Sequence, residues 1–285
     1  MSEYYNLPVE KNKTHKRRFR FKPLPDNKPH INLILFLLTI TSTWLMLGPW
    51  YSISIMIFLT AHEMGHYLMC RKYGVRATLP FFIPFPYLNP FGTMGAFIQI
   101  KSVIPSKKAL FDIGAAGPLA GFVVTLPLIY FGVKLSTILP AGEMSEGGFY
   151  LGESILFKYI SYISIGAVEE GYDVSLHPLA YAGWVGLFVT ALNLIPIGQL
   201  DGGHIFYSMF GRLTKKTNII FLSGFGVLTL IYPGWALLFI LLLFFGRNHP
   251  APIDNSTALD GNRRLLGFFI FIIFLLSFTA VPFKF

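Results

Sequence analysis

Charged residues are scarce in this chain, and their scarcity excludes an ordinary soluble domain. Asp, Glu, Lys and Arg together make up 13% of the 285 residues, whereas soluble domains carry about 25%. Apolar residues make up 53%, and several long stretches hold almost no charge. This composition places the chain among membrane proteins that cross the bilayer several times.

Cysteine is almost absent as well. Cys70 is the single cysteine, so the chain cannot form an internal disulfide bond. We interpret Cys70 as a small apolar residue of a helix. No Ala-x-Ala cleavage site follows the first apolar run, and the basic segment before that run is too long for a signal peptide. We therefore expect the first apolar run to be a retained membrane anchor.

Acidic residues are outnumbered by basic ones, which gives a net charge of +9. Seven Lys and Arg side chains crowd into residues 11–22, directly before the first apolar run. Such a block marks the cytoplasmic side of a membrane helix, and no nucleic-acid-binding motif accompanies it. We expect residues 1–30 to form a basic cytoplasmic tail that binds no nucleic acid. We expect the protein to lie in the lipid bilayer of a bacterial inner membrane.

Long apolar runs, separated by Gly, Pro or basic residues, predict the membrane helices. They cover residues 31–48, 52–70, 109–133, 178–197, 218–246 and 265–281. Residues 218–246 are long for one span and are interrupted at Tyr232-Pro233-Gly234, which favours a hairpin of two short helices. We predict an all-α polytopic membrane protein with about six or seven transmembrane helices, in which residues 31–285 form a single domain.

Residues 77–105 have a different pattern. Four prolines fall within residues 80–90 and forbid a regular helix. Strand-forming residues follow Gly92 and Gly95, so we predict an apolar loop and a small membrane-associated β-hairpin or sheet. Irregular backbone at membrane depth must be buried in protein or line a wet cavity. This favours a site here over the alternative of a loop lying on the membrane surface.

Residues 136–177 form the longest polar stretch after the tail, with six acidic residues and one lysine. The alternation of spans places this loop outside, where Lys and Arg are rare. Its middle, residues 149–165, has the pattern of an amphipathic helix. The loop is too short for an added folded domain of ordinary size.

Small residues recur in the helix predicted for residues 109–133. Gly114, Gly117 and Gly121 include a small-x-x-x-small pair, a spacing that lets two membrane helices approach closely. We interpret these glycines as a packing surface rather than as catalytic residues.

Three ionisable side chains interrupt the apolar residues 53–73. His62, Glu63 and His66 form the pattern His-Glu-x-x-His, and such residues inside a membrane helix are costly and usually functional. On a helix the two imidazoles lie one turn apart on one face, where they can share a zinc ion. Glu63 can then reach a zinc-bound water as a base.

A catalytic zinc needs a third protein ligand and leaves its fourth position to water. Asp201 is the best candidate, because it is an acid near membrane depth in a segment that Pro196 and three glycines interrupt. We expect irregular backbone to present Asp201. The other candidates are His204, His177, His249, Glu63 itself and the loop acids. His204 can also be a partner of a ligand, or simply a helix residue.

Two separated motifs resemble those of one known family. The first motif is His62-Glu63-Met64-Gly65-His66, and the second is Asn193, Pro196 and Leu200-Asp201-Gly202. Together they look like the signature motifs of the site-2 protease family, whose members are intramembrane zinc metalloproteases. The resemblance covers roughly residues 51–210, and residues 92–95 and 114–121 also resemble segments of that family.

The resemblance extends to one branch of the family. Loop 136–177 is too short for the PDZ domain that many members carry, and the C-terminal nucleotide-sensing domain of others is not expected here. The chain is most similar to the minimal, membrane-only branch, including its chloroplast-type relatives. Regulation by those added modules is therefore not expected.

The resemblance implies a site and a substrate. Zinc (Zn²⁺) would be held by His62, His66 and Asp201, in segments 53–73 and 193–204, with Glu63 as the catalytic acid and base. Asn193 would help bind substrate or polarise the scissile carbonyl. The substrate would be a transmembrane protein. Because a helix hides its carbonyl groups in internal hydrogen bonds, it must first unwind, and we hypothesise that a strand around Gly92–Ile100, which includes Gly95, holds the unwound segment by edge pairing.

Two other functions stay open. A membrane metal transporter also places imidazoles and a carboxylate at membrane depth, although it more often shows several ligand clusters along a path. A catalytically silent scaffold would gather membrane partners. Replacing Glu63 by Gln separates these readings, because a protease should lose turnover while keeping zinc and a scaffold should be unaffected.

Overall fold

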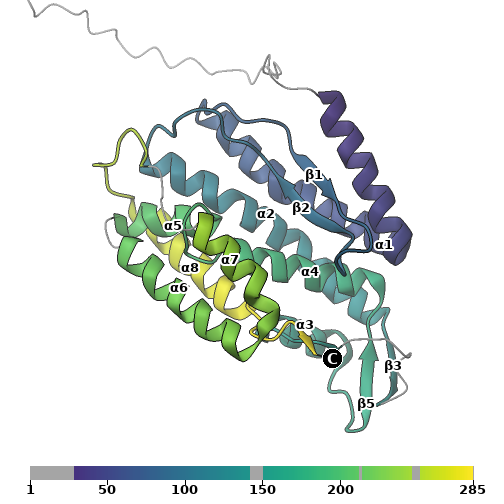
Figure 1. The fold of residues 1–285 in the computed structure, drawn as a ribbon. Coiled ribbons are helices and arrows are strands. Elements are labelled where there is room, and N and C mark those ends of the chain that lie inside the picture. Colours follow the sequence, from purple (N-terminus) through teal and green to yellow (C-terminus); the bar gives the residue numbers. More distant parts are fainter. Residues whose placement is uncertain (1–28, 142–149, 212–213, 246–250, 285) are drawn as a thin grey trace, which may run out of the picture.

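The computed structural model describes residues 29–141, 150–211, 214–245 and 251–284. These parts are mostly helical, with three small two-stranded sheets (Figure 1). The helical fold with a small β-hairpin is therefore confirmed. The basic tail predicted for residues 1–30 lies almost wholly outside the described residues.

Helix α1, Pro29–Lys72, consists of two limbs that meet at Gly48. Gly48 has φ 80° and ψ 177°, a conformation that is accessible to glycine and strained for other residues. We call residues 29–47 the first limb and residues 49–72 the second limb. The limbs fold back on each other, with the Thr43 and Ser52 hydroxyl oxygens 2.7 Å apart. They correspond to the predicted helices 31–48 and 52–70.

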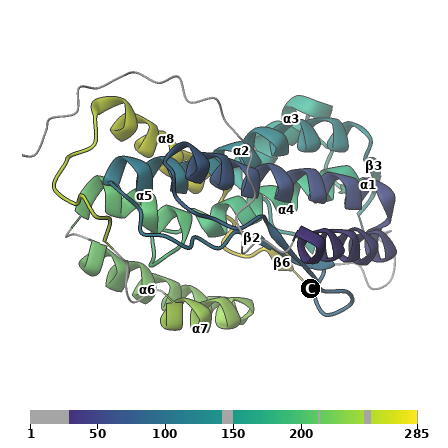
Figure 2. The ribbon, with the colours of Figure 1, turned by 90° about the horizontal axis from the view of Figure 1, so that it is seen from above.

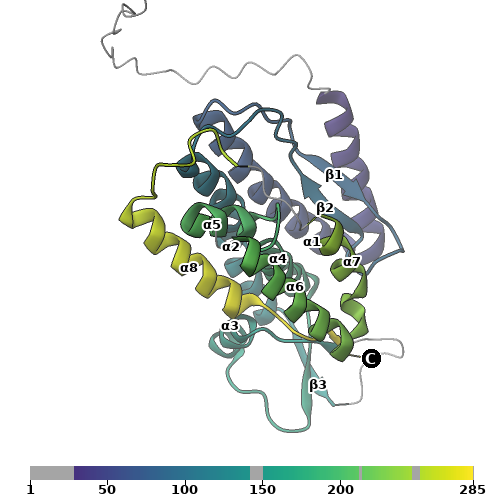
Figure 3. The same ribbon diagram turned by 60° about the vertical axis from the view of Figure 1, so that its left-hand side comes forward.

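Helices α2, Lys107–Lys134, and α4, Pro178–Asn193, pack beside the second limb and form the centre of the molecule (Figures 1 and 3). The contact between α1 and α2 is close because Gly65 has no side chain. A Cβ at residue 65 would lie 2.4 Å from the carbonyl oxygen of Ala116. The packing surface predicted on α2 is thus confirmed, and it brings the second limb against α2.

The remaining helices surround this centre. They are α3 (Ile155–Ile165), α5 (Asp201–Phe210), α6 (Thr214–Ile231), a 3-10 turn (Pro233–Trp235), α7 (Ala236–Phe245) and α8 (Gly261–Ser277). Figure 2 shows α3 and the α6–α7 pair on opposite sides of the central helices. The hairpin predicted within residues 218–246 is confirmed, because a Cβ at Gly226 would lie 3.3 Å from the Phe239 ring.

Four predicted helix ends were wrong by about a turn. Helix α6 begins at Thr214 rather than at residue 218, and helix α8 ends at Ser277 rather than at residue 281. Helix α4 ends at Asn193 rather than at residue 197, because Pro196 disfavours helical backbone at the residue before it. Helix α8 begins at Gly261 rather than at residue 265. Its N-cap is Asp260, whose carboxylate accepts a hydrogen bond from the Arg263 backbone N–H.

The predicted hairpin lies within residues 77–105. Strand β1, Phe81–Pro84, pairs antiparallel with β2, Thr93–Phe97, and Phe81 lies opposite Phe97. The pairing continues through a single bridge between Ala77 and Ile100. Figure 1 shows the hairpin lying along α1, and β2 is partly exposed, with Thr93 buried and Met94 and Phe97 about half exposed.

The loop at residues 136–177 contains one predicted helix and several strands that the sequence did not indicate. Helix α3 falls within the predicted residues 149–165. Strand β3, Thr137–Pro140, pairs with β5, Tyr172–Ser175, and β4, Tyr150–Leu151, pairs with β6, Phe283–Lys284. These short strands show no clear alternation of apolar and polar residues, so local pattern did not reveal them.

Three helix ends are joined by polar side chains opposite the β3–β5 sheet (Figure 3). The Arg263 guanidinium on α8 binds the Asp112 carboxylate on α2 through two contacts of 2.7 Å. The Tyr73 hydroxyl, just after α1, donates to the same carboxylate at 2.5 Å. Arg263 also forms an ion pair with Asp260. The start of α8 is thereby attached to α1 and α2.

Candidate metal centre

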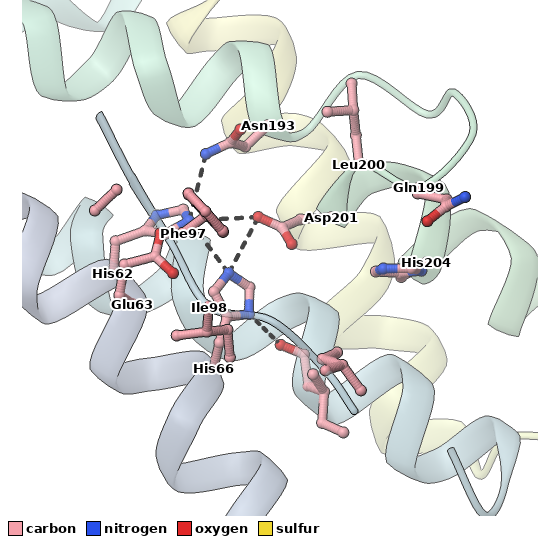
Figure 4. A pocket seen from close by; sticks show the side chains of 13 residues that line it. His62, Glu63, His66, Phe97, Ile98, Asn193, Gln199, Leu200, Asp201 and His204 are labelled. Atoms are coloured by element: carbon pink, nitrogen blue, oxygen red, sulfur yellow. Dashed lines mark hydrogen bonds and ion pairs between the residues drawn. The ribbon is translucent and has the colours of Figure 1, made fainter. Parts of the chain in front are cut away.

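The two motifs come together in the middle of the molecule. His62 and His66 project from one face of the second limb, and Asp201, at the start of α5, approaches them from the opposite side (Figure 4). The two histidine Nε2 atoms are 3.2 Å apart. Asp201 Oδ2 lies 3.4 Å from His62 Nε2 and 3.3 Å from His66 Nε2. Three donor atoms thus form a nearly equilateral triangle.

This triangle fits a zinc ion. A tetrahedral zinc with bonds of about 2.0–2.1 Å separates its ligand atoms by about 3.3–3.4 Å. Two imidazole nitrogens and one carboxylate oxygen are also a donor set that zinc accepts in catalytic sites. Among the described residues, this is the group of His, Cys, Asp and Glu side chains that could hold a metal.

The orientation of His66 depends on α2. His66 Nδ1 lies 2.7 Å from the Ile113 carbonyl oxygen, to which it can donate a proton. This hydrogen bond leaves the lone pair of the other ring nitrogen, Nε2, to bind a metal. The ring fits against α2 because residue 117 is a glycine, since a Cβ on Gly117 would lie 2.0 Å from His66 Nε2.

His62 is held differently. Its Nδ1 atom is buried and has no hydrogen-bond partner among the described residues. A Cβ on Gly121 would lie 3.3 Å from that atom, so the small residues of α2 also give His62 its place. The glycines predicted to be a packing surface therefore shape the metal centre directly.

Asp201 reaches the histidines through a compact turn after α4. The chain leaves the helix at Leu194, passes Gly198 at φ 55° and begins α5 at Asp201. The turn is tight, because a Cβ on Gly202 would lie 2.0 Å from the Leu194 carbonyl oxygen. The expectation of irregular backbone at Asp201 was therefore wrong by one residue. The irregular segment precedes Asp201, which occupies the first turn of α5.

Glu63 lies beside the triangle without joining it. The residue is buried, with 5% of its surface exposed, and it lines the same cavity as Ile98, just after β2. Asn193, the last residue of α4, places its side-chain nitrogen 3.3 Å from His62 Nε2. The structure thus brings a carboxylate and an amide to the same centre.

These groups line a cavity of about 230 Å³. Its polar lining residues are His62, Glu63, His66, Asn193, Gln199, Asp201 and His204, and its apolar ones are Ala96, Phe97, Ile98, Ile100, Ile113 and Leu200. In Figure 4, Phe97 and Ile98 lie near the two histidines, whereas Gln199 and His204 lie beyond Asp201, farther from the histidines. The cavity therefore combines polar and ionisable side chains with apolar ones, most of which come from β2 and the residues just after it.

The other candidate ligands lie elsewhere. His204 lines the cavity but stands apart from the triangle in Figure 4. His177 caps the start of α4, where its Nδ1 accepts a hydrogen bond from the Leu179 N–H. His249 falls outside the described residues. Gly95 is on β2 but is not among the cavity-lining residues.

Sequence reasoning missed a partner that acts through the backbone. Ile113 orients His66 with its backbone carbonyl oxygen. Every residue carries such a group, so no side-chain pattern marks it. Gln199 and Leu200 directly precede Asp201 in the sequence, so their place in the cavity lining could have been predicted from the position of Asp201 alone.

The comparison with protein families agrees with this geometry. The model of peptidase family M50 matches residues 50–231, which include both motifs and the hairpin between them. The chain belongs to peptidase family M50. It is accordingly a membrane protein of that family, and among the described residues α1 and α2 are long and apolar enough to cross a bilayer.

Several curated relatives of this M50 chain are named as zinc metalloproteases. It is 32% identical to the probable zinc metalloprotease EGY2, chloroplastic, of Arabidopsis thaliana, over 80% of the chain and 41% of the relative. It is 34% identical to a probable EGY1 of Oryza sativa subsp. japonica, over 78% and 38%. The chain thus spans about two fifths of the length of these relatives. No solved structure matches it.

Proposed function

We propose that the chain is an intramembrane zinc metalloprotease that hydrolyses peptide bonds in or near transmembrane segments of membrane proteins. The triangle of His62, His66 and Asp201 carries this proposal, because it has the spacing of a zinc site and places Glu63 beside it. Membership of family M50 and the names of the relatives support the same reaction. They do not favour the transporter or the scaffold.

The chain's own groups have distinct roles in the proposed reaction. Zinc, when bound, supplies a Lewis acid that lowers the pKa of water to about 7. Glu63 accepts a proton from the attacking water and delivers it to the leaving amine. Asn193 donates from its side-chain amide to the oxygen of the scissile carbonyl, where negative charge develops. The apolar cavity walls keep bulk water away from these groups.

The substrate segment is proposed to bind along β2. A helix hides its carbonyl groups in internal hydrogen bonds, so a transmembrane substrate must unwind before water can attack. Strand β2 pairs with β1 on one edge, and its other edge can pair with an extended substrate. Ala96 and Phe97 of β2 line the cavity, so a segment held there would lie beside Glu63.

The orientation in the membrane follows from charge at the helix ends. Helix α1 ends in Arg71 and Lys72, and α2 begins with Lys107 and Lys108. These ends meet the start of α8 opposite the acidic β3–β5 region. We propose that the basic ends and the N-terminus face the cytoplasm. The proposed location is a bacterial inner membrane, crossed by about six or seven helices.

The test is a pair of matched substitutions in the purified full chain. Glu63→Gln should lower cleavage of a transmembrane peptide by at least about 100-fold, the contribution of a general acid–base group, while zinc per chain is unchanged. Glu153→Gln, in the exposed loop before α3, is the control and should retain activity. Equal cleavage by the wild type and Glu63→Gln would reject the protease.

The substrates can be identified in cells. Membrane fragments that accumulate with the Glu63→Gln chain, and not with the wild type, are the expected substrates. Quantitative proteomics of the membrane fraction measures them. An identical set of fragments in both cells would contradict the proposed reaction.

A further inference from the structure

Backbone carbonyl groups just before β1 and in the loop between β1 and β2 accept hydrogen bonds from side chains of neighbouring helices. In a membrane protein, backbone groups away from water must be paired within the protein. Four side chains donate hydrogen bonds to these carbonyl groups, and we call these four residues the hairpin clamp. Asn32 Nδ2 donates to the carbonyl oxygens of Leu79 (3.2 Å) and Pro80 (2.8 Å), Ser42 Oγ to Gly92 (2.5 Å), Tyr51 OH to Phe91 (2.9 Å) and Tyr181 OH to Pro90 (3.2 Å).

The clamp joins two helices to the hairpin, α1 through both of its limbs and α4. Asn32 and Ser42 lie on the first limb of α1, Tyr51 lies at the start of the second limb, and Tyr181 lies on α4. Figure 3 shows the hairpin between the first limb and the helical centre. The clamp therefore sets the position of the hairpin relative to both the first limb and the helices that carry the metal centre.

Ser42 differs from its neighbours in the first limb. The hydroxyls of Thr39 and Thr41 donate to carbonyl oxygens four residues back in their own helix, the usual partner of a hydroxyl in an apolar helix. Ser42 instead donates to Gly92, fifty residues along the chain. Asn32 likewise crosses to the hairpin, with only 7% of the residue exposed. These are directed contacts between two segments.

The hairpin in turn forms part of the wall of the cavity that holds the proposed catalytic group. Ala96 and Phe97 of β2, and Ile98 directly after it, line this cavity together with Glu63. A shift of β2 would therefore change the cavity wall beside Glu63.

We propose that the four clamp residues are positioning residues, which hold β2 in place so that Ala96, Phe97 and Ile98 form the cavity wall beside Glu63. They act through the hairpin and are not part of the metal centre. The structural part of this proposal is independent of chemistry, whereas its kinetic part rests on the proposed function. Loss of the clamp should lower kcat more than it raises KM, because a displaced β2 misplaces the bound segment relative to Glu63.

The test compares Asn32→Leu and Ser42→Ala, singly and together, with Thr39→Val as the control. Thr39 is buried on the same limb and donates only within its helix. In the double variant, which loses three hydrogen bonds to the hairpin, hydrogen exchange of the amides of residues 93–98 should rise at least about tenfold. The kcat for a transmembrane peptide should fall by about the same factor, with zinc content unchanged. Thr39→Val should alter none of these.

Tyr51→Phe with Tyr181→Phe removes the other two donors and keeps both rings, so it tests the clamp if the first-limb variants do not fold. Exchange of residues 93–98 at the wild-type rate in the folded variants would overturn the positioning role. A kcat of the clamp variants that is no lower than the kcat of Thr39→Val would overturn it as well. If the wild-type chain binds no zinc and cleaves nothing, the proposed function fails, and the exchange rates still decide the clamp.

Discussion

Gly117 lies directly against His66, at a distance that no larger residue could keep. A Cβ at residue 117 would be 2.0 Å from His66 Nε2, well inside van der Waals contact. The two residues come from α2 and the second limb of α1. The absence of a side chain at Gly117 of α2 thus allows the His66 imidazole of α1 to occupy its position in the metal centre.

Gly117→Ala should therefore reduce zinc binding as well as stability. The added methyl group displaces the His66 ring, and overpacking of this kind typically costs about 1–3 kcal/mol of stability. Zinc per folded chain, measured by elemental analysis, should fall. Gly132→Ala is the control, because its Cβ would lie 2.2 Å from the Ala180 nitrogen, on α4. That variant should lose stability and keep zinc, and equal zinc loss in both would contradict the prediction.

Asp201→Asn should weaken zinc binding strongly, because it removes the charged oxygen of the triangle. Loss of a group that merely supports a ligand costs about 10–100-fold in affinity, so loss of a ligand should cost at least about 100-fold. Competition with a chromophoric chelator measures the affinity. His204→Asn, in the same cavity but outside the triangle, should keep zinc. The opposite ranking of the two variants would assign the third ligand to His204.

Gly95→Val should lower cleavage of a transmembrane peptide without removing zinc. Gly95 has φ 92°, and no atom lies within 4 Å of a Cβ built there. The substitution therefore acts on the strand's backbone and on a paired substrate, not through a clash. Gly74→Val is the control. Gly74 also has a positive φ, 68°, and open space around its Cβ position, but it lies in the turn after α1. An unchanged cleavage rate for Gly95→Val, or an equal drop for Gly74→Val, would reject a role of β2 in substrate binding.

Asp112→Asn should destabilise the attachment of α8 by about 1–2 kcal/mol, because a partly exposed charged pair contributes less than a fully buried one. The variant removes the charge that Arg263 contacts twice and that accepts from Tyr73. Thermal unfolding in detergent measures the change. Arg264→Gln, exposed beside Arg263, should leave the midpoint unchanged. A midpoint for Asp112→Asn equal to that of the control would show that the pair contributes no stability.

The sequence predicted the parts of the fold that depend on local chemistry. Gly48 and Pro196 end helices because of their own backbone limits, and the prolines of residues 80–90 exclude a helix where the hairpin stands. The i and i+4 spacing of His62 and His66 needs only a helix to place both rings on one face. The short strands of loop 136–177 had no such local signal, because their pairing partners lie far away in the sequence.

By itself, then, the sequence determined which side chains could bind a metal and which segments could be helical. Only the tertiary structure decided that Asp201 completes the triangle, that Ile113 orients His66, and that Ser42 contacts the hairpin loop. The physical reason is that these contacts join segments distant in sequence and largely use backbone groups. Every residue possesses such groups, so helix packing alone selects the ones that act.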